Sequence, residues 1–154
     1  MPHPQPTLIP GLRSPYETTG GIVHFARMLD KIRLHAQGVL PAEWVTAKGD
    51  VSPATFDARC CRFLKIDYTA LEAETLEGGD DRQILEWAFL HGRKPDDDEI
   101  EIWNGFMMKR GWRDAGTRRL HERLAEIGLP PGTVETMFDF IELDEGRPPR
   151  HHAG

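Results

Sequence analysis

Glycine residues divide this chain of 154 residues into short segments, most of which carry apolar side chains at helical spacing. A glycine ends a helix readily because it adopts the left-handed backbone conformation at little cost. No run alternates apolar and polar residues over a convincing length, so the sequence shows no clear strand. We therefore predict an all-α fold, a compact single-domain bundle of about six or seven short helices. The helices are expected to end at Gly38, Gly78, Gly92, Gly111, Gly128 and Gly146.

Residues that commonly cap helix N-termini precede most of these segments. The side chain of such a residue accepts a hydrogen bond from a backbone N–H that has no partner within the helix. The predicted caps are Ser52, Asp67, Asp80 or Asp81, Asp96, Asp114 and Thr133.

Proline residues set the N-terminal end apart from the helical body and favour an extended strap there. We expect residues 1–10 to be a flexible Pro-rich N-terminus, residues 11–147 a single helical domain and residues 148–154 a flexible tail. Four apolar residues would dock the strap onto the domain: Leu8, Ile9, Leu12 and Tyr16.

The composition is typical of a soluble globular protein, with 39% hydrophobic and 29% charged residues. The formal net charge of -6 disfavours nucleic acid as a partner, because broad binding to a phosphate backbone needs positive charge. The N-terminus has no basic region followed by an apolar core, and no apolar run reaches the length of about 18 residues that a membrane span needs. We therefore expect a cytoplasmic protein without a membrane span.

The cysteines support the same location. Cys60 and Cys61 are adjacent, and a disulfide between neighbours would be strained, because consecutive Cα atoms lie only about 3.8 Å apart. We expect both to be reduced thiols, as in the cytosol.

The stretch from Arg13 to Gly38 holds the strongest helical pattern. We predict a helix over about residues 21–37 that begins at the Gly20-Gly21 turn and buries one apolar face. That face carries Ile22, Phe25, Ala26, Leu29, Ile32 and Ala36.

The polar face of this predicted helix indicates a site for a small anionic molecule. Backbone N–H groups and the helix dipole favour a carboxylate or phosphate at a helix N-terminus. A nearby arginine and lysine would add positive charge, and a histidine one turn inside would transfer a proton near neutral pH. The sequence fits both a binding site and an enzymatic one. The ligand-binding candidates are Arg13, Tyr16, Gly20, Gly21, Arg27 and Lys31, and the catalytic candidate is His24.

A plainer interpretation competes with this site. Charged residues at helical spacing usually form a solvated face, which here would carry His24, Arg27, Lys31 and His35. The two glycines would then only turn the chain.

Cys61 is a second catalytic candidate. It lies near Arg59 and Arg62, whose charges would lower the pKa of its thiol if they are close. Cys60 has the helical spacing of a small buried residue. The scattered histidines lack the spacing of paired metal ligands, so we predict no metal site, and the sequence identifies no cofactor.

Two further segments suggest a non-catalytic alternative, a module that binds another protein or regulates it. The aromatic-rich segment from Trp103 to Trp112, with Met107 and Met108, fits either core packing or a partner-binding surface. A homo-oligomer is also compatible with it. A locally basic segment offers a contact for an acidic partner or, against the acidic whole, for nucleic acid, and contains Arg118, Arg119, His121 and Arg123.

Four long segments carry a resemblance to a known family. They are LRSPYETTGGIVHFARMLDKIRLHAQGVLP, FDARCCRFLKIDY, ILEWAFLHGRKPDDDEIEIWNGFMMKRGWRD and FDFIELDEGR. Together they resemble the bacterial family catalogued as domain of unknown function 5069, over roughly residues 11–147. The resemblance implies a stand-alone, compact bacterial cytosolic protein, and it carries no activity from which residue roles would follow.

Overall fold

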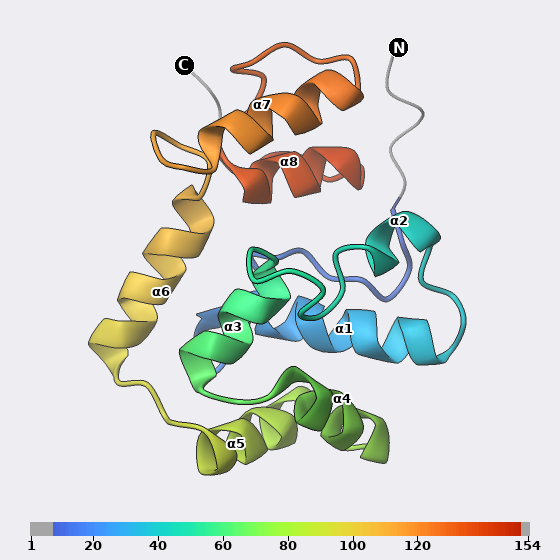
Figure 1. Ribbon diagram of the computed structural model, residues 1–154, viewed down its shortest axis with the longest axis vertical. Helices are drawn as coiled ribbons and strands as arrows, with labels where there is room; N and C mark the ends of the chain where they lie inside the picture. Colours follow the sequence, from blue (N-terminus) through green and yellow to red (C-terminus); the bar gives the residue numbers. More distant parts are fainter. Residues whose placement is uncertain (1–7, 152–154) are drawn as a thin grey trace. The chain divides into compact units, whose positions relative to one another are not determined.

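The computed structural model describes residues 8–151 and is mostly helical (Figure 1). These residues form eight helices and one two-stranded antiparallel sheet, and no helix among them is long and apolar enough to cross a membrane. The predictions for residues 1–7 and 152–154, within the two ends expected to be flexible, lie outside the described residues. The elements are β1 (Thr18–Thr19), β2 (Ile22–Val23), α1 (Phe25–Ala36), α2 (Ala42–Val45), α3 (Phe56–Leu64), α4 (Tyr68–Glu77), α5 (Asp81–His91), α6 (Asp97–Lys109), α7 (Thr117–Glu126) and α8 (Met137–Asp144).

The β-hairpin corrects the all-α prediction. Gly20 and Gly21 have φ values of 58° and 78°, and a two-residue type I′ turn requires positive φ at both central positions. The turn joins the two strands with Thr19 opposite Ile22. Helix α1 therefore begins only at Phe25, and the glycine turn is not its N-terminus.

The segment before the hairpin is not extended throughout its described part. The backbone turns at residues 10–11 and again at 15–16, and Gly11 has a φ of 84°. Leu12 and Tyr16 are buried as predicted, whereas Leu8 is 62% exposed. The described part of the predicted extended strap is thus a lead-in with two turns.

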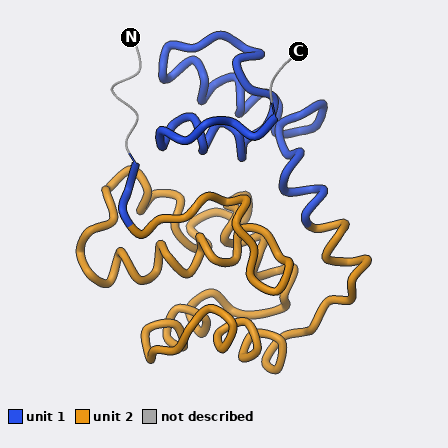
Figure 2. The backbone as a smooth tube through the Cα atoms, turned by 180° about the vertical axis from the view of Figure 1, so that it is seen from behind, with its two compact units in different colours: residues 1–10, 104–154 blue, residues 11–103 orange. Residues whose placement is uncertain are grey.

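The described residues divide into two compact units, coloured separately in Figure 2. One unit comprises residues 11–103, and the other comprises residues 104–151 with residues 8–10. Helix α6 is continuous across the boundary between them. The single domain over residues 11–147 stays a prediction.

Helix α1 is the centre of the unit of residues 11–103. It contacts α2, α3, α4 and β1, and each of its residues from Phe25 to Ile32 is buried. Helix α5 in turn packs on α4 and β1. Each large apolar side chain that is fully buried contributes about 1.5–3 kcal/mol. In this unit these include Phe25, Met28, Leu29, Ile32, Leu64, Leu71, Ile84 and Leu85.

The helix caps agree with the sequence where the signal is strongest. Asp67 accepts a hydrogen bond from the N–H of Ala70 at 3.0 Å, and Asp80 forms a capping box with Gln83. Asp96 likewise exchanges hydrogen bonds with Glu99. The other three helices begin two or three residues later than predicted, at the caps Thr55, Gly116 and Thr136.

The unit of residues 104–151 is built on α7 and α8, which pack against each other. Its core contains Leu120, Leu124, Val134 and Phe140. The completely buried carboxylate of Asp139 accepts hydrogen bonds from the backbone N–H groups of Arg150 and His151, at 3.0 and 3.1 Å. Residues 150 and 151, in the described part of the predicted flexible tail, are thus bonded to α8.

Candidate functional site

The polar face of α1 is buried. Arg27, Asp30 and Lys31 expose only 5%, 6% and 4% of their surfaces, and His24, the residue before the helix, exposes 1%. Only His35 of the predicted cationic face is exposed. The expected solvated face is therefore wrong for the first two turns, because neighbouring segments supply partners for these charges.

Asp30 fastens the lead-in segment to α1. Its carboxylate accepts hydrogen bonds from the backbone N–H and from two guanidinium nitrogens of Arg13, each at 2.9 Å. Arg27 donates to the backbone carbonyl of Arg13 at 3.1 Å. Two charged residues of α1 therefore hold one residue of the lead-in by both its backbone and its side chain.

Asp81, the first residue of α5, extends this ion-pair network. Its two carboxylate oxygens contact Arg13 at 2.5 Å and Arg33 at 2.7 Å. Hydrogen bonding to Asp30 raises the pKa of Arg13 above its ordinary value. Burial raises the pKa of Asp81, but the guanidinium groups of Arg33 and Arg13 outweigh burial and hold that pKa below its ordinary value. Arg13 and Asp81 are therefore both charged at neutral pH.

An open depression of about 610 Å³ lies beside this network, between the hairpin and the start of α5. A volume of about 300–1,000 Å³ is usual for small-molecule sites. Positive charge comes from three arginines on three different segments. The depression is lined by Arg13, Thr18, Thr19, Gly20, Arg33, Gly79, Asp80, Asp81 and Arg82.

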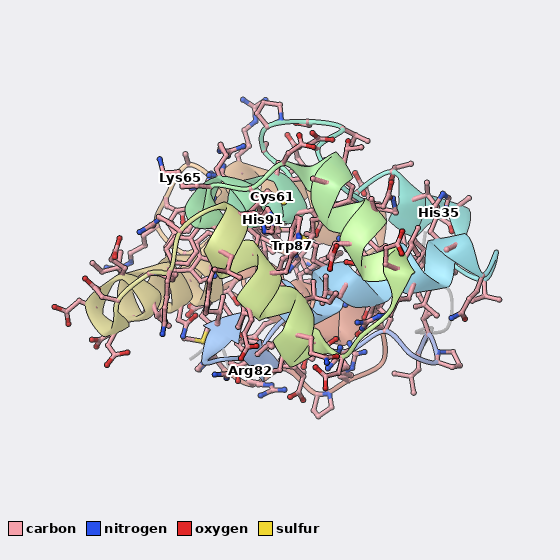
Figure 3. All side chains as sticks on the ribbon, turned by 90° about the horizontal axis from the view of Figure 1, so that it is seen from below. His35, Cys61, Lys65, Arg82, Trp87 and His91 are labelled. Atoms are coloured by element: carbon pink, nitrogen blue, oxygen red, sulfur yellow. The ribbon has the colours of Figure 1, made fainter. Side chains whose placement is uncertain are left out.

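Arg82 is the most exposed cation of the depression. Its side chain is 66% exposed and makes a 3.4 Å ion pair with Glu86 through Nε. Within residues 8–151, no hydrogen bond uses its two terminal nitrogens. Arg82 lies on α5 beside the hairpin (Figure 3), where a Cβ built on Gly20 would be 3.8 Å from its Nη1. The depression thus has donors that the fold does not use.

A second cluster is enclosed in the interior and contacts the backbone of the loop of residues 46–55. Asp57 of α3 is completely buried, and its carboxylate contacts Nε2 of His24 at 2.7 Å and Nζ of Lys31 at 2.8 Å. It also accepts the backbone N–H of Gly49 at 2.7 Å. The cap of α3, Thr55, donates to the carbonyl of Gly49 at 2.6 Å. Asp57 therefore links α1, α3 and the loop between them.

Burial decides the protonation state of His24, whereas neighbouring charges decide that of Asp57. It lowers the pKa of His24 to about 4, although Asp57 favours the charged imidazole. Burial also raises the pKa of Asp57, but Lys31 and His24 outweigh it and hold that pKa well below its ordinary value. At neutral pH the cluster is a neutral imidazole beside an ion pair.

His24 also has an unusual backbone. Its φ of 74° is left-handed, which costs a residue other than glycine about 1–3 kcal/mol. The backbone N–H donates to the carbonyl of Pro15 at 2.9 Å, while the side chain contacts Asp57. These two contacts, one through the backbone and one through the side chain, hold the strained conformation.

The expected lowering of the Cys61 pKa is wrong. Cys61 is 5% exposed, and burial raises the pKa of its thiol to about 12, with Asp57 adding to the effect. The sulfur donates to the sulfur of Met28 at 3.9 Å. Cys60 is completely buried, and its pKa is also raised by burial. No group of three or more His, Cys, Asp or Glu side chains in residues 8–151 is arranged to hold a metal ion.

The structure therefore separates the predicted site residues. Arg13 and Gly20 line the depression, whereas Gly21 is at the exposed tip of the hairpin. Three residues of the depression and the buried cluster could not be identified from the sequence. Arg33 and Arg82 lie on helix faces, as most surface arginines do. Asp57 contacts His24 across 33 residues. The predicted residues that are buried and do not line the depression are Tyr16, His24, Arg27, Lys31 and Cys61.

Comparison with known proteins supports one assignment. A search of curated proteins finds none that matches. The sequence model of one family matches residues 9–147, a range that includes both the depression and the buried cluster. The chain therefore belongs to the family described as Domain of unknown function (DUF5069).

Proposed function

We propose that this protein binds a small anionic molecule in the depression between the β-hairpin and the start of α5. The observation that carries the proposal is that Arg13, Arg33 and Arg82 line one open depression of suitable volume. Arginine suits this role because its planar guanidinium donates two parallel hydrogen bonds to a carboxylate or phosphate.

The ion-pair network supports the proposal. Asp30 and Asp81 fix Arg13 and Arg33 on one side of the depression, so little side-chain freedom remains to be lost when a ligand binds. Their carboxylates also balance these two positive charges. Arg82 pairs with Glu86 through Nε alone, which leaves its two terminal nitrogens as the main donors to an anion. A ligand that contacts both Arg33 and Arg82 would gain from the fixed cation and from the exposed one.

The proposal differs in place from the site expected at the start of the first helix. His24 and Lys31 are enclosed in the interior, and strand β2 separates the glycine turn from α1. Proton transfer by His24 and a role for Cys61 stay predictions. We propose a cytoplasmic location as well, which the free thiols of Cys60 and Cys61 support.

Thermal unfolding with a panel of anions tests the proposal. Inorganic phosphate, pyrophosphate, citrate and glutarate would each be added at increasing concentration. A ligand present at about ten times its Kd stabilises the native state by about 1.4 kcal/mol and raises the midpoint by about 3–5 °C. Arg82→Gln should remove that rise for every anion that binds.

Arg118→Gln is the matched control, because Arg118 is 92% exposed, forms a similar i,i+4 ion pair with Glu122 and does not line the depression. It should leave the rise unchanged. The proposal fails if no anion in the panel raises the midpoint, or if Arg118→Gln removes the rise as fully as Arg82→Gln does.

A partner-binding surface is the second candidate. Trp103 does not contribute to it, because this residue is 7% exposed and stacks on Phe63. Trp112 and Phe106 are 43% and 40% exposed, and Arg113 and Arg110 lie over their rings. Sedimentation of the wild type and of Trp112→Ala tests this candidate, since a self-associating surface would weaken with the loss of the ring.

A further inference from the structure

We infer that the ligand of the depression carries an ammonium group as well as a carboxylate, as an amino acid or a short peptide does. This inference rests on the proposed function and names its ligand class. It follows from Asp80, which lines the depression and whose carboxylate forms no ion pair with any described residue.

The two neighbouring acids at the start of α5 differ in their partners. Asp81 uses one carboxylate oxygen for Arg33 and the other for Arg13. Asp80 uses Oδ1 to accept the N–H of Gln83, and within residues 8–151 no ion pair or hydrogen bond engages its Oδ2. The side chain of Asp80 is therefore a helix cap with one carboxylate oxygen still available.

The cations of the depression show the same contrast. Arg13 is held by Asp30 and Asp81, and Arg33 by Asp81 through Nη1. The terminal nitrogens of Arg82 engage no group in the described chain, so the depression has an available cation and an available anion two residues apart. Thr18 and Thr19 are on the same lining.

A zwitterion matches both groups of this pair, whereas a simple anion matches only Arg82. A carboxylate accepts two hydrogen bonds from a guanidinium, and an ammonium donates to a carboxylate as a compact charge. An anion without an ammonium would satisfy Arg82 but would bring its negative charge near Asp80. An amine without a carboxylate would have the opposite fault, so only a ligand with both groups gains at both residues.

The size of the depression allows more than one source of this chemistry. Its volume of about 610 Å³ exceeds the space that one small amino acid fills, and it is open to solvent. A free amino acid and a dipeptide both present a carboxylate and an ammonium, at different separations. Binding of one and not the other identifies the source.

Calorimetric titration of matched compounds tests the inference on the wild-type protein. Glutamate and glutarate have the same two carboxylates and differ only in the α-ammonium. Alanine and propionate have one carboxylate each and differ in the same way. We expect the ammonium compound of a pair to bind at least about tenfold more tightly. Ala-Ala and its N-acetyl derivative form the corresponding peptide pair.

Asp80→Asn isolates the carboxylate, because asparagine caps a helix about as well as aspartate does. It should reduce the preference for the ammonium compound to near parity and leave binding of glutarate equal or tighter. Asp67→Asn changes the cap of α4 in the same way and is the control. It should keep the full preference.

The outcomes separate the two proposals. If glutarate and propionate bind the wild type as tightly as glutamate and alanine, the zwitterion is wrong while the anion site stands. If the preference persists in Asp80→Asn, the assignment of Asp80 is wrong. If no compound in either panel binds, the proposed function fails together with the inference.

Discussion

Replacing Asp57 by asparagine should strongly destabilise the protein. The substitution keeps the size of the side chain but removes the charge that neutralises Lys31, which lies 2.8 Å away and is 4% exposed. Removing one partner of a buried ion pair costs about 3–5 kcal/mol, because the remaining charge stays in a poorly solvated interior. The new amide also has only one oxygen, so it loses acceptor capacity toward His24, Lys31 and the N–H of Gly49.

Urea unfolding followed by circular dichroism measures this cost. With a slope of about 2 kcal/mol per molar urea, a loss of about 4 kcal/mol lowers the unfolding midpoint by about 2 M. Domains of this kind have about 5–15 kcal/mol of stability in total, so the variant should remain folded only at low urea. The midpoint reports stability alone only if the slope of the unfolding free energy against urea concentration is the same in the variant and the wild type.

The double variant Asp57→Asn with Lys31→Met is the control for the mechanism. It removes the buried cation together with its carboxylate, so it should be more stable than Asp57→Asn alone by about 1–2 kcal/mol or more. A loss below about 1 kcal/mol in Asp57→Asn would refute the reasoning. Equal stability of the single and double variants would show that the cost comes from lost hydrogen bonds and not from the charge of Lys31.

Two further predictions concern the same elements. Stability should fall by up to about 3 kcal/mol between pH 6.5 and pH 4, since an unfolded His24 binds a proton below about 6.5 while the folded one, with its pKa of about 4, stays neutral. Urea unfolding midpoints measured against pH test this. His24→Asn is the control, because asparagine tolerates the left-handed backbone, and an equally steep fall of its midpoint with pH would contradict the prediction. Gly20→Ala should cost about 1–3 kcal/mol more than Gly21→Ala: both have positive φ, but a Cβ at Gly20 would lie 2.6 Å from Leu85 and one at Gly21 meets nothing within 4 Å. Equal thermal midpoints for the two variants would exclude this close approach.

The helices could be predicted because their signals are local. Asp67, Asp80 and Asp96 each stand three residues before the N–H group that they cap, so the sequence contains the whole interaction. The hairpin has a local signal as well, but a second local pattern overlaps it. Ile22 fits the helical spacing of Phe25 and the residues after it, and that apolar pattern hid the turn signal of two glycines between β-branched residues.

The site could be predicted only in part, because its contacts join distant segments. Arg13 and Gly20 belong to the stretch that the sequence singled out, and both line the depression. Arg33 meets Asp81 across 48 residues, and no spacing rule connects them. The sequence showed that α1 has a polar face. Its burial depends on the lead-in and on the loop of residues 46–55, neither of which has a periodic pattern of its own.

Those two irregular segments explain why α1 is charged where it is buried. An irregular segment has few backbone hydrogen bonds of its own, so its buried N–H and C=O groups need other partners. An apolar helix face offers them none, whereas a charged one does. Asp30 binds the backbone and side chain of Arg13 on the lead-in, while its neighbour Lys31 binds Asp57 and the carbonyl of Ala47. The adjacent charges therefore hold different segments. Through Arg13 and Asp81, Asp30 also fixes one wall of the depression. A charge-removing change at Asp30 should consequently weaken ligand binding, whereas one at Lys31 should act on stability first.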